Sequence, residues 1–455
     1  MSSADLVIKN GRVAVSSSLR SCAIAAKGGK VTWMGSNSNA PSASKVIDAS
    51  NLVVLPGVID VHVHMRDPGA TYKEDFRSGT AAAAAGGVTT IFDMPNNTPP
   101  TKNVEALRMK IKAAEEKALV DYALYGLITA GNAGDIMPLA REGVIGFKCY
   151  MAQTTGNVVP PSDDEMLADF AVIAKAGLRV SVHAEDDAII QRRIANLRRK
   201  NRVDALAHYE SRPAEAESRA IRRAIRFALR ARCNLHIAHL SSAAGVKELR
   251  AARGPHPRRN AASITAETCP QYLLLDKHDY QGKGSLMKSN PSIKRSEDKA
   301  ALWRAAKDGT IDMIATDHAP HTLDEKTAGE SIFDQPSGFP GLETSVALML
   351  TCVNKGRLSL ARYVQMASEN PAKAWGIYPK KGTVSVGVDA DFTIVDMKRE
   401  WKIDSQKFLS KAKFSPFDGF RVKGAAVYTV VRGNTVMDHG HVNTGSKGEM
   451  LRPQA

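Results

Sequence analysis

The amino-acid sequence predicts an α/β protein, a (β/α)8 barrel of the TIM type with a small β-rich domain formed from both termini. The middle of the chain alternates short β-branched runs with segments of helical length, which is typical of strand–helix units in a parallel sheet. Both ends consist instead of short strand-like runs and turns. We expect residues 1–55 and 376–455 to form the small domain and residues 56–375 to form the barrel.

Eight candidate strands alternate with helical segments through the middle of the chain. The strands are Val53 to His64, Val88 to Met94, Tyr122 to Leu127, Ile145 to Cys149, Val180 to His183, Leu235 to His239, Ile264 to Thr268 and Met313 to Asp317. Helical candidates include Val104 to Ala118, Asp164 to Ala176, Glu215 to Ala231 and Glu297 to Lys307. Eight such units over roughly 250 to 300 residues match a (β/α)8 barrel, whose active site lies at the carboxyl ends of the strands.

The two ends of the chain share a different pattern. From Asp5 to about Leu55, short strand-like runs are broken by turns such as Asn10-Gly11. The same pattern returns near the C-terminus, in 390–395 and 426–431. Because these segments flank the barrel region, we expect them to assemble into one small β domain.

The cysteines and the N-terminus narrow the class of protein. Five scattered cysteines without a C-x-x-C pair indicate neither a disulfide framework nor a thiolate zinc site. The N-terminus lacks the basic start and the apolar run of a signal peptide, and no apolar stretch of roughly 18 residues is available to span a bilayer. We therefore expect a cytoplasmic protein with no membrane partner.

The chain is basic, with a formal net charge of +15, which is compatible with a nucleic acid or an anionic small molecule as partner. Much of the charge lies in two segments of helical pattern, Arg192 to Arg202 and Arg219 to Arg232, without interleaved aromatic residues. Such segments are typical of solvated helix faces, so we expect no nucleic-acid partner. The alternative, a nucleic-acid binder, is tested by whether binding to an arbitrary duplex disappears at high salt.

Six side chains of interest for metal binding lie at the ends of predicted barrel strands. They are His62, His64, Lys148, His183, His239 and Asp317. Alternation along a strand places His62 and His64 on the same face, toward the barrel mouth. A single histidine at a strand end is more often a hydrogen-bonded core residue. The set, however, offers the imidazole and carboxylate donors that zinc and similar ions prefer, and it predicts a metal site.

Two long motifs connect these residues with a known family. Residues 55–69 (LPGVIDVHVHMRDPG) and 316–326 (TDHAPHTLDEK) resemble motifs of the dihydroorotases in the amidohydrolase superfamily. Shorter similar segments are DMPNNT at 93–98, GFK at 146–148, HAE at 183–185 and GFPGLET at 338–344. The resemblance extends over nearly the whole chain.

The resemblance implies a hydrolase with two zinc ions per subunit. The six side chains would hold the ions around a bridging hydroxide. A protonated lysine has no lone pair for a metal, so Lys148 either extends to the surface or is carboxylated to a carbamate that bridges both ions. Coordination lowers the pKa of water toward neutrality, and Asp317 would be the general base and acid. The implied reaction is the reversible hydrolysis of (S)-dihydroorotate to N-carbamoyl-L-aspartate in pyrimidine biosynthesis.

Arg66 is the residue that favours dihydroorotate among the cyclic amides opened by this superfamily. It follows His64 by two residues, where a guanidinium could clamp the substrate carboxylate with two parallel hydrogen bonds. Hydantoin, allantoin and dihydrouracil carry no carboxylate. By the resemblance, Asn96 and His321 would share this grip. The other implied substrate contacts are Asn290, Ser337, Gly338 and Thr154.

Several alternatives stay open. Residues 143–152 and 209–213 look like stretches of allantoinases and hydantoinases. However, Gln153 stands where dihydropyrimidinases have a tyrosine, and allantoinases lack the arginine at position 66. An inactive homologue with a structural role is a further alternative, although all six candidate ligands are present. The resemblance also implies a homodimer or homotetramer, and association with aspartate transcarbamoylase.

Overall fold

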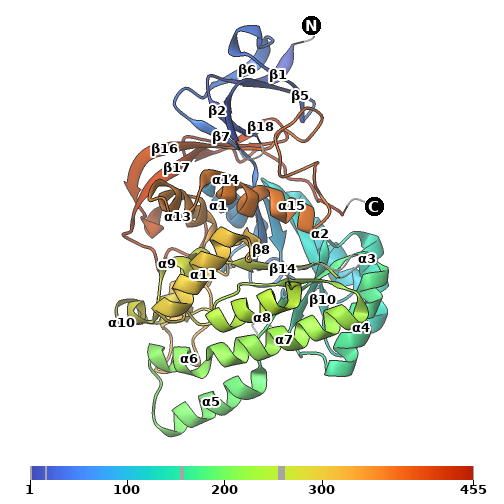
Figure 1. Cartoon of the computed structure of the whole chain (residues 1–455), viewed down its shortest axis with the longest axis vertical. Helices are drawn as coiled ribbons and strands as arrows, with labels where there is room; N and C mark the ends of the chain where they lie inside the picture. The colour runs from blue at the N-terminus through green and yellow to red at the C-terminus, as the bar shows by residue number, and fades with distance from the viewer. Residues whose placement is uncertain (1–2, 16–17, 154–157, 255–261, 454–455) are drawn as a thin grey trace.

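A computed structural model describes residues 3–15, 18–153, 158–254 and 262–453. Thr154, a predicted substrate contact, lies outside the described residues. Figure 1 shows the N-terminal strands at one end of the molecule, above β16 (Phe392–Lys402) and β17 (Arg421–Val431), with the barrel and its helices below.

Eight parallel strands form the barrel. They are β8 (Val58–Val63), β9 (Val88–Asp93), β10 (Asp121–Ile128), β11 (Gly146–Tyr150), β12 (Arg179–His183), β13 (Asn234–Ile237), β14 (Ile264–Thr268) and β15 (Met313–Ile314), paired in that order. The two edges of this sheet meet after β15. There, Val63 forms a parallel bridge with His318, and the backbone N–H of His64 donates to the carbonyl of His318 over 2.8 Å. The predicted (β/α)8 barrel is therefore confirmed.

Helices surround the barrel strands (Figure 1). They are α1 (Phe76–Gly86), α2 (Val104–Lys117), α3 (Ile136–Glu142), α4 (Asp163–Lys175), α5 (Asp187–Arg199), α6 (Ala205–Ser211), α7 (Ala214–Ala231), α8 (Ala243–Arg253), α9 (Pro270–Leu274), α10 (Tyr280–Lys283), α11 (Ser296–Asp308), α12 (Leu323–Thr327), α13 (Leu342–Asn354), α14 (Leu360–Val364) and α15 (Asn370–Ala374). The four helices predicted from sequence are α2, α4, α7 and α11. Side-chain caps explain where the first two begin, because Asn103 accepts from the N–H of Ala106 and Ser162 from that of Glu165.

Both ends of the chain contribute strands to the small β domain. A seven-stranded sheet contains β2 (Arg12–Val15), β3 (Ser18–Ser21), β7 (Val53–Pro56), β16 (Phe392–Lys402), β17 (Arg421–Val431), β18 (Asn434–Asp438) and β19 (His441–Val442). A four-stranded sheet contains β1 (Ala4–Lys9), β4 (Ala23–Lys27), β5 (Lys30–Gly35) and β6 (Ala43–Asp48). A shared core that includes Ile8, Ile24, Phe392 and Val430 joins the two sheets. The β-rich part formed from both termini is thus confirmed, while the exact domain boundaries stay a prediction.

The predicted first strand, 53–64, is two strands in two sheets. β7 pairs with β16 in the small domain, whereas β8 pairs with β9 in the barrel. The chain changes sheets at Gly57, where a Cβ atom would lie 2.3 Å from Oγ1 of Thr89. Both strands are buried and apolar, so the hydrophobic pattern alone does not separate them.

A buried ion cluster joins the small domain to the N-terminal end of β10. Nζ of Lys381 lies 2.6 Å from Asp121, 3.0 Å from Asp389 and 2.5 Å from Asp391. Burial opposes the charged ammonium, but the three carboxylates outweigh it and raise the pKa of Lys381 above its ordinary value. Although three carboxylates so close together resemble a cation site, the lysine ammonium already lies among them.

All five cysteines are free, and four of them are buried: Cys149, Cys233, Cys269 and Cys352. Cys22 is half-buried. Within the described ranges, no helix combines the length and the apolar character needed to cross a membrane.

Candidate metal centre

A cavity that is partly open to solvent lies at the carboxyl ends of the barrel strands. The residues that line it are His62, His64, Arg66, Asn96, Tyr150, His183, His239, Asn290, Asp317, Ala319, Ser337 and Gly338. This is the end of the barrel at which the sequence predicts the active site. The candidate ligands enter it in two groups.

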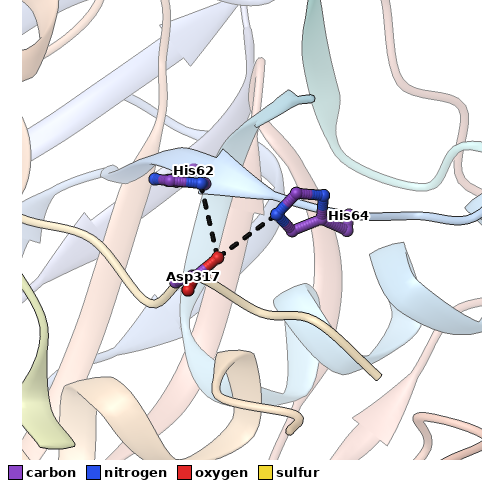
Figure 2. Close-up of side chains that lie close together, drawn as sticks. All are labelled: His62, His64 and Asp317. Carbon is purple, nitrogen blue, oxygen red and sulfur yellow. Dashed lines mark hydrogen bonds and ion pairs between the residues drawn. The ribbon is translucent and has the colours of Figure 1, made fainter. Parts of the chain in front are cut away.

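The first group is His62, His64 and Asp317 (Figure 2). Oδ1 of Asp317 lies 3.3 Å from Nε2 of His62 and 3.2 Å from Nε2 of His64. Burial lowers the pKa of His64 to about 3, so its imidazole is neutral. The two imidazoles outweigh the effect of burial on Asp317 and hold the pKa of its carboxyl below the ordinary value. Two imidazoles and a carboxylate whose ligand atoms all lie within 4.8 Å of one another could hold a metal ion.

Hydrogen bonds on the opposite ring nitrogens orient both histidines. Nδ1 of His62 lies 2.5 Å from Oε1 of Glu267 on β14, and Nδ1 of His64 lies 2.7 Å from Oδ1 of Asn96. An oxygen acceptor at Nδ1 fixes the tautomer in which the Nε2 lone pair points toward a metal. Asn96, a predicted substrate contact, therefore lines the cavity and also orients His64.

The second group is His183 at the end of β12 and His239 just after β13. Nδ1 of His183 lies 2.9 Å from Nε2 of His239, and Nε2 of His183 lies 3.1 Å from Glu185. Burial lowers the pKa of both imidazoles, most strongly that of His239. Arg212 in turn pairs with Glu185. The Glu185 carboxylate fixes the ring of His183 so that Nδ1 faces His239.

Lys148 lies inside β11 and is fully buried, so it does not reach the surface. Its electrostatic partners include Asp317 from the first group and both histidines of the second. Burial lowers the pKa of its ammonium to about 8, and Nζ has no hydrogen-bond partner among the described residues. Nδ1 of His239 is likewise buried without a partner in the described part of the chain. These unpartnered nitrogens, together with the donor set, fit a metal centre.

Arg66 lines the cavity beside the first group, with its backbone in the left-handed region at φ 59°. Its Nε donates to the carbonyl of Pro320 over 3.2 Å, and Nη2 lies 3.2 Å from Nε2 of His321. His321 is fully buried behind Arg66 and is not among the lining residues. Its Nε2 also lies 3.1 Å from the carbonyl of Ser337. His321 thus supports Arg66 and the loop at Ser337 from behind.

The remaining predicted substrate contacts among the described residues, Asn290, Ser337 and Gly338, also line the cavity. Oγ of Ser337 lies 3.1 Å from Oδ1 of Asn290. Gly338 has a φ of 122°, and a Cβ there would lie 2.5 Å from the carbonyl oxygen of Ala319. A side chain at position 338 would therefore displace the loop that carries Ser337.

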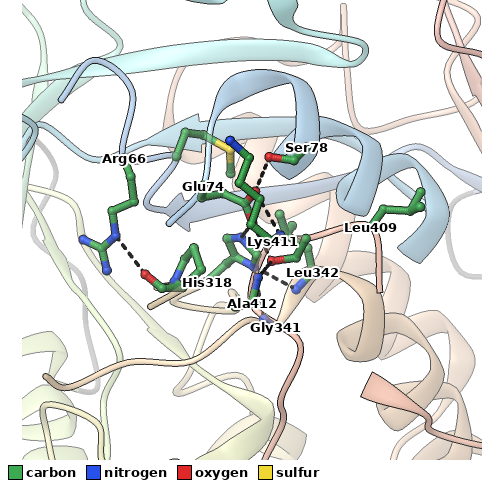
Figure 3. A network of polar contacts seen from close by, with 12 residues as sticks. Arg66, Glu74, Ser78, His318, Gly341, Leu342, Leu409, Lys411 and Ala412 are labelled. Atoms are coloured by element: carbon green, nitrogen blue, oxygen red, sulfur yellow. Dashed lines mark hydrogen bonds and ion pairs between the residues drawn. The ribbon is translucent and has the colours of Figure 1, made fainter. Parts of the chain in front are cut away.

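A polar network braces this end of the barrel from the small domain (Figure 3). His318 follows Asp317, and its Nδ1 accepts from the N–H of Gly341 over 3.1 Å. Its Nε2 lies 3.4 Å from Glu74. Glu74 also accepts a hydrogen bond of 2.5 Å from Ser410, in the connection between β16 and β17. The position of Asp317 thus depends indirectly on a segment far along the chain.

Sequence reasoning missed three side chains of this site. Glu267 and Glu185 orient candidate ligands, and Tyr150 lines the cavity. An acidic residue inside the predicted strand 264–268 was an available signal for Glu267, because an ionised carboxylate in a buried strand needs partners. Glu185 lies in the HAE segment that carries the resemblance. Tyr150 lies two positions after Lys148 in the same strand, so alternation along that strand was an available signal for it.

The family profile described as "Amidohydrolase family" matches residues 53–436. The chain belongs to the amidohydrolase family. An L-hydantoinase of Paenarthrobacter aurescens is 38% identical over 442 residues, which cover 96% of this chain and 95% of the relative. A dihydroorotase of Methanosarcina acetivorans is 37% identical over 453 residues, which cover 98% and 95%. The solved L-hydantoinase (dihydropyrimidinase) of Arthrobacter aurescens superposes with a TM-score of 0.95 at 37% identity, covering 99% of this chain and 100% of that one.

As an amidohydrolase with these relatives, the protein is a hydrolase that acts on cyclic amides. Its substrate is a small molecule, as the resemblance implies. The relatives named hydantoinase and dihydroorotase are similar to this amidohydrolase to almost the same degree. The choice of ring therefore depends on the residues that line the cavity.

Proposed function

We propose that this amidohydrolase is a dihydroorotase, which hydrolyses dihydroorotate to N-carbamoyl-L-aspartate and catalyses the reverse ring closure. The observation that supports this choice is Arg66. Among the described residues that line the cavity, it is the only one with a permanent positive charge. A guanidinium there complements the substrate carboxylate through two parallel hydrogen bonds. Asn96, Asn290, Ser337 and Gly338 would make the remaining contacts, with His321 holding Arg66.

The proposed cofactor is a pair of zinc ions. His62, His64 and Asp317 would hold one ion, His183 and His239 the other, and Lys148 would bridge them as a carbamate. A neutral amine reacts with CO2, and the lowered pKa of Lys148 makes that form accessible near neutral pH. When bound, the ions would supply an activated water and polarise the amide carbonyl.

The side chains of the site would then position the substrate and move protons. Asp317 is ionised at neutral pH because its pKa lies below the ordinary value, so it can accept a proton from the attacking water. It would return this proton to the amide nitrogen as the ring opens. Glu267 and Asn96 would keep the two histidines beside it in their ligand tautomers.

A second candidate is the opening of a hydantoin ring. It is favoured by the L-hydantoinase relative at 38% identity and by the TM-score of 0.95 to the solved L-hydantoinase. It is also favoured by the position of His321, which does not line the cavity and so offers no direct contact to a carboxylate. On this alternative the metal chemistry is unchanged, and Arg66 would contact a ring oxygen instead.

A side-by-side assay decides between these functions. The zinc-loaded protein is given dihydroorotate, allantoin, hydantoin and dihydrouracil, and kcat/KM is compared. We expect dihydroorotate to lead by orders of magnitude. If a ring without a carboxylate leads instead, the dihydroorotase proposal fails while the cyclic-amide chemistry stands.

The proposed assembly is a homodimer or homotetramer in the cytoplasm, associated with aspartate transcarbamoylase. This part of the proposal rests on the family resemblance alone. Light scattering after size exclusion measures the subunit number, and sedimentation of the mixed enzymes tests the association. A monomer that sediments independently would contradict both.

A further inference from the structure

Tyr150 carries a buried hydroxyl that the candidate metal centre does not use. It is the last residue of β11, two positions after Lys148, and it lines the cavity. The residue is only 3% exposed, yet its hydroxyl has no hydrogen-bond partner among the described residues. A buried hydroxyl without a partner destabilises the folded protein, so its retention at a binding cavity needs an explanation.

Tyr150 lies close to the candidate metal ligands. Nζ of Lys148 lies 5.3 Å from the centre of the phenol ring, and the ring of His183 lies 6.1 Å from it, centre to centre. The phenol also interacts electrostatically with Asp317 and Arg66. The phenol therefore lies near both the candidate metal ligands and the candidate carboxylate clamp.

Other buried tyrosines show that this arrangement is specific to position 150. The hydroxyl of Tyr125, on the neighbouring strand β10, donates to the carbonyl of Val61 over 3.1 Å. Tyr272 donates to the carbonyl of Pro291 over 2.8 Å. The hydroxyl of Tyr122 is also buried without a partner in the described part of the chain, but Tyr122 does not line the cavity. Tyr150 alone among these four combines an unpartnered hydroxyl with the cavity wall.

We propose that Tyr150 donates a hydrogen bond to the carbonyl oxygen of the scissile amide. When the water oxygen bonds to the carbonyl carbon, the π electrons move to the carbonyl oxygen, which becomes negative. The Tyr150 hydroxyl stabilises that charge and keeps its own proton. The C–N bond then breaks, and its electron pair takes the proton that water has lost. The inference rests on the proposed ring opening, but it holds for either ring.

Tyr150→Phe in the metal-loaded enzyme tests this role, because it removes only the hydroxyl. Removing one such donor costs about 10²- to 10³-fold in kcat in other enzymes. We expect kcat to fall on the order of 100-fold, with KM within about threefold of the wild-type value. Bound metal should be unchanged, and the unfolding midpoint should be equal or higher, because an unpartnered hydroxyl is lost.

Tyr122→Phe is the matched control, because it also removes an unpartnered buried hydroxyl but lies outside the cavity. It should keep kcat, and its unfolding midpoint should likewise be equal or higher. An unchanged kcat in Tyr150→Phe, a rise in KM alone, or a loss of metal would each overturn the proposed role. The variants are assayed with whichever ring the wild type opens best. If dihydroorotate is not a substrate, the dihydroorotase proposal fails, but the role of Tyr150 can still be tested with the ring that is opened.

Discussion

Oε1 of Glu267 lies 2.5 Å from Nδ1 of His62, so a carboxylate on β14 orients a candidate ligand on β8. The same side chain contacts Nε2 of His236 over 3.0 Å and accepts from the backbone N–H of His239 over 3.0 Å. His62 belongs to the first ligand group and His239 to the second. One buried carboxylate therefore contacts residues of both groups.

Glu267→Gln should weaken metal binding. The amide keeps the size of the side chain but replaces one acceptor oxygen with a donor, so it no longer satisfies all three groups. Loss of such a partner typically costs 10- to 100-fold in metal affinity, and we expect a loss of about that size. Competition with a chromophoric chelator measures it. Thr268→Val, on the same strand, removes a hydrogen bond to Leu240 and should leave metal affinity unchanged. Equal affinities in all three proteins would contradict the orienting role.

Lys148→Ala should abolish both metal binding and turnover. The expectation follows from the burial of Nζ and its lack of a partner among the described residues. A short carboxylic acid added to the variant should restore part of both, because it supplies the carboxylate that the carbamate provides. Metal analysis with and without propionate is the measurement. Full metal occupancy in the unsupplemented variant would exclude the carbamate bridge.

Arg66→Met should lower kcat/KM for dihydroorotate on the order of 100-fold or more, because the substrate carboxylate loses a bidentate partner. Bound metal should stay the same, since Arg66 contacts Pro320 and His321 rather than a candidate ligand. Arg66→Lys keeps the charge but not the planar fork, so an intermediate loss is expected. Any turnover of hydantoin, which has no carboxylate, serves as the internal control. Unaltered kinetics with dihydroorotate would remove the main support for that substrate.

The order of barrel elements was predictable from the sequence because each unit repeats the same pattern, a short β-branched run followed by a segment of helical length. The candidate ligands were predictable for a related reason, since parallel strands bring their carboxyl ends together whatever the distance along the chain. His62 and Asp317 are far apart in sequence, yet their side chains lie 3.3 Å apart.

Other features required three-dimensional information. The change of sheet at Gly57 depends on Thr89 and Asp391, which no local pattern connects to it. Packing between distant segments decides whether the Tyr150 hydroxyl finds a hydrogen-bond partner. It also decides whether His321 lies behind Arg66 or in the cavity. Single-sequence periodicity carries no information about such contacts.

The carboxyl of Glu343 in α13 should make stability depend on pH. It accepts from the N–H groups of Leu409 and Ser410, but burial, with a further contribution from nearby Glu74, raises its pKa from 4.5 to about 7. Between these two values the folded protein holds a proton that the unfolded chain has released. The free energy of unfolding therefore falls as pH rises through this window.

Glu343→Gln should remove that dependence. Urea unfolding at pH 5, 6, 7 and 8 measures the free energy of unfolding of the wild type and of the variant. The value for the variant minus the value for the wild type should increase progressively as pH rises. Altered hydrogen bonding in the variant adds the same amount to this difference at every pH, so it does not affect how the difference changes with pH. Glu400→Gln, at a carboxylate that is 70% exposed, is the control and should follow the wild type. Parallel curves for wild type and Glu343→Gln would contradict the raised pKa.

Lys381→Met should destabilise the protein strongly without affecting the metal centre. The lysine is 1% exposed and lies within 3.0 Å of Asp121, Asp389 and Asp391, so its loss leaves buried carboxylates without their central cation. Breaking a buried ion pair from one side typically costs about 3–5 kcal/mol, and we expect a loss of that size in urea unfolding. Lys373→Met, which removes a half-exposed partner of Glu369, should cost less than about 1 kcal/mol. Adding Asp391→Asn to Lys381→Met should recover part of the loss, because one uncompensated charge is removed. If the double variant is less stable than Lys381→Met, repulsion among the carboxylates is not the cause of the stability loss in Lys381→Met.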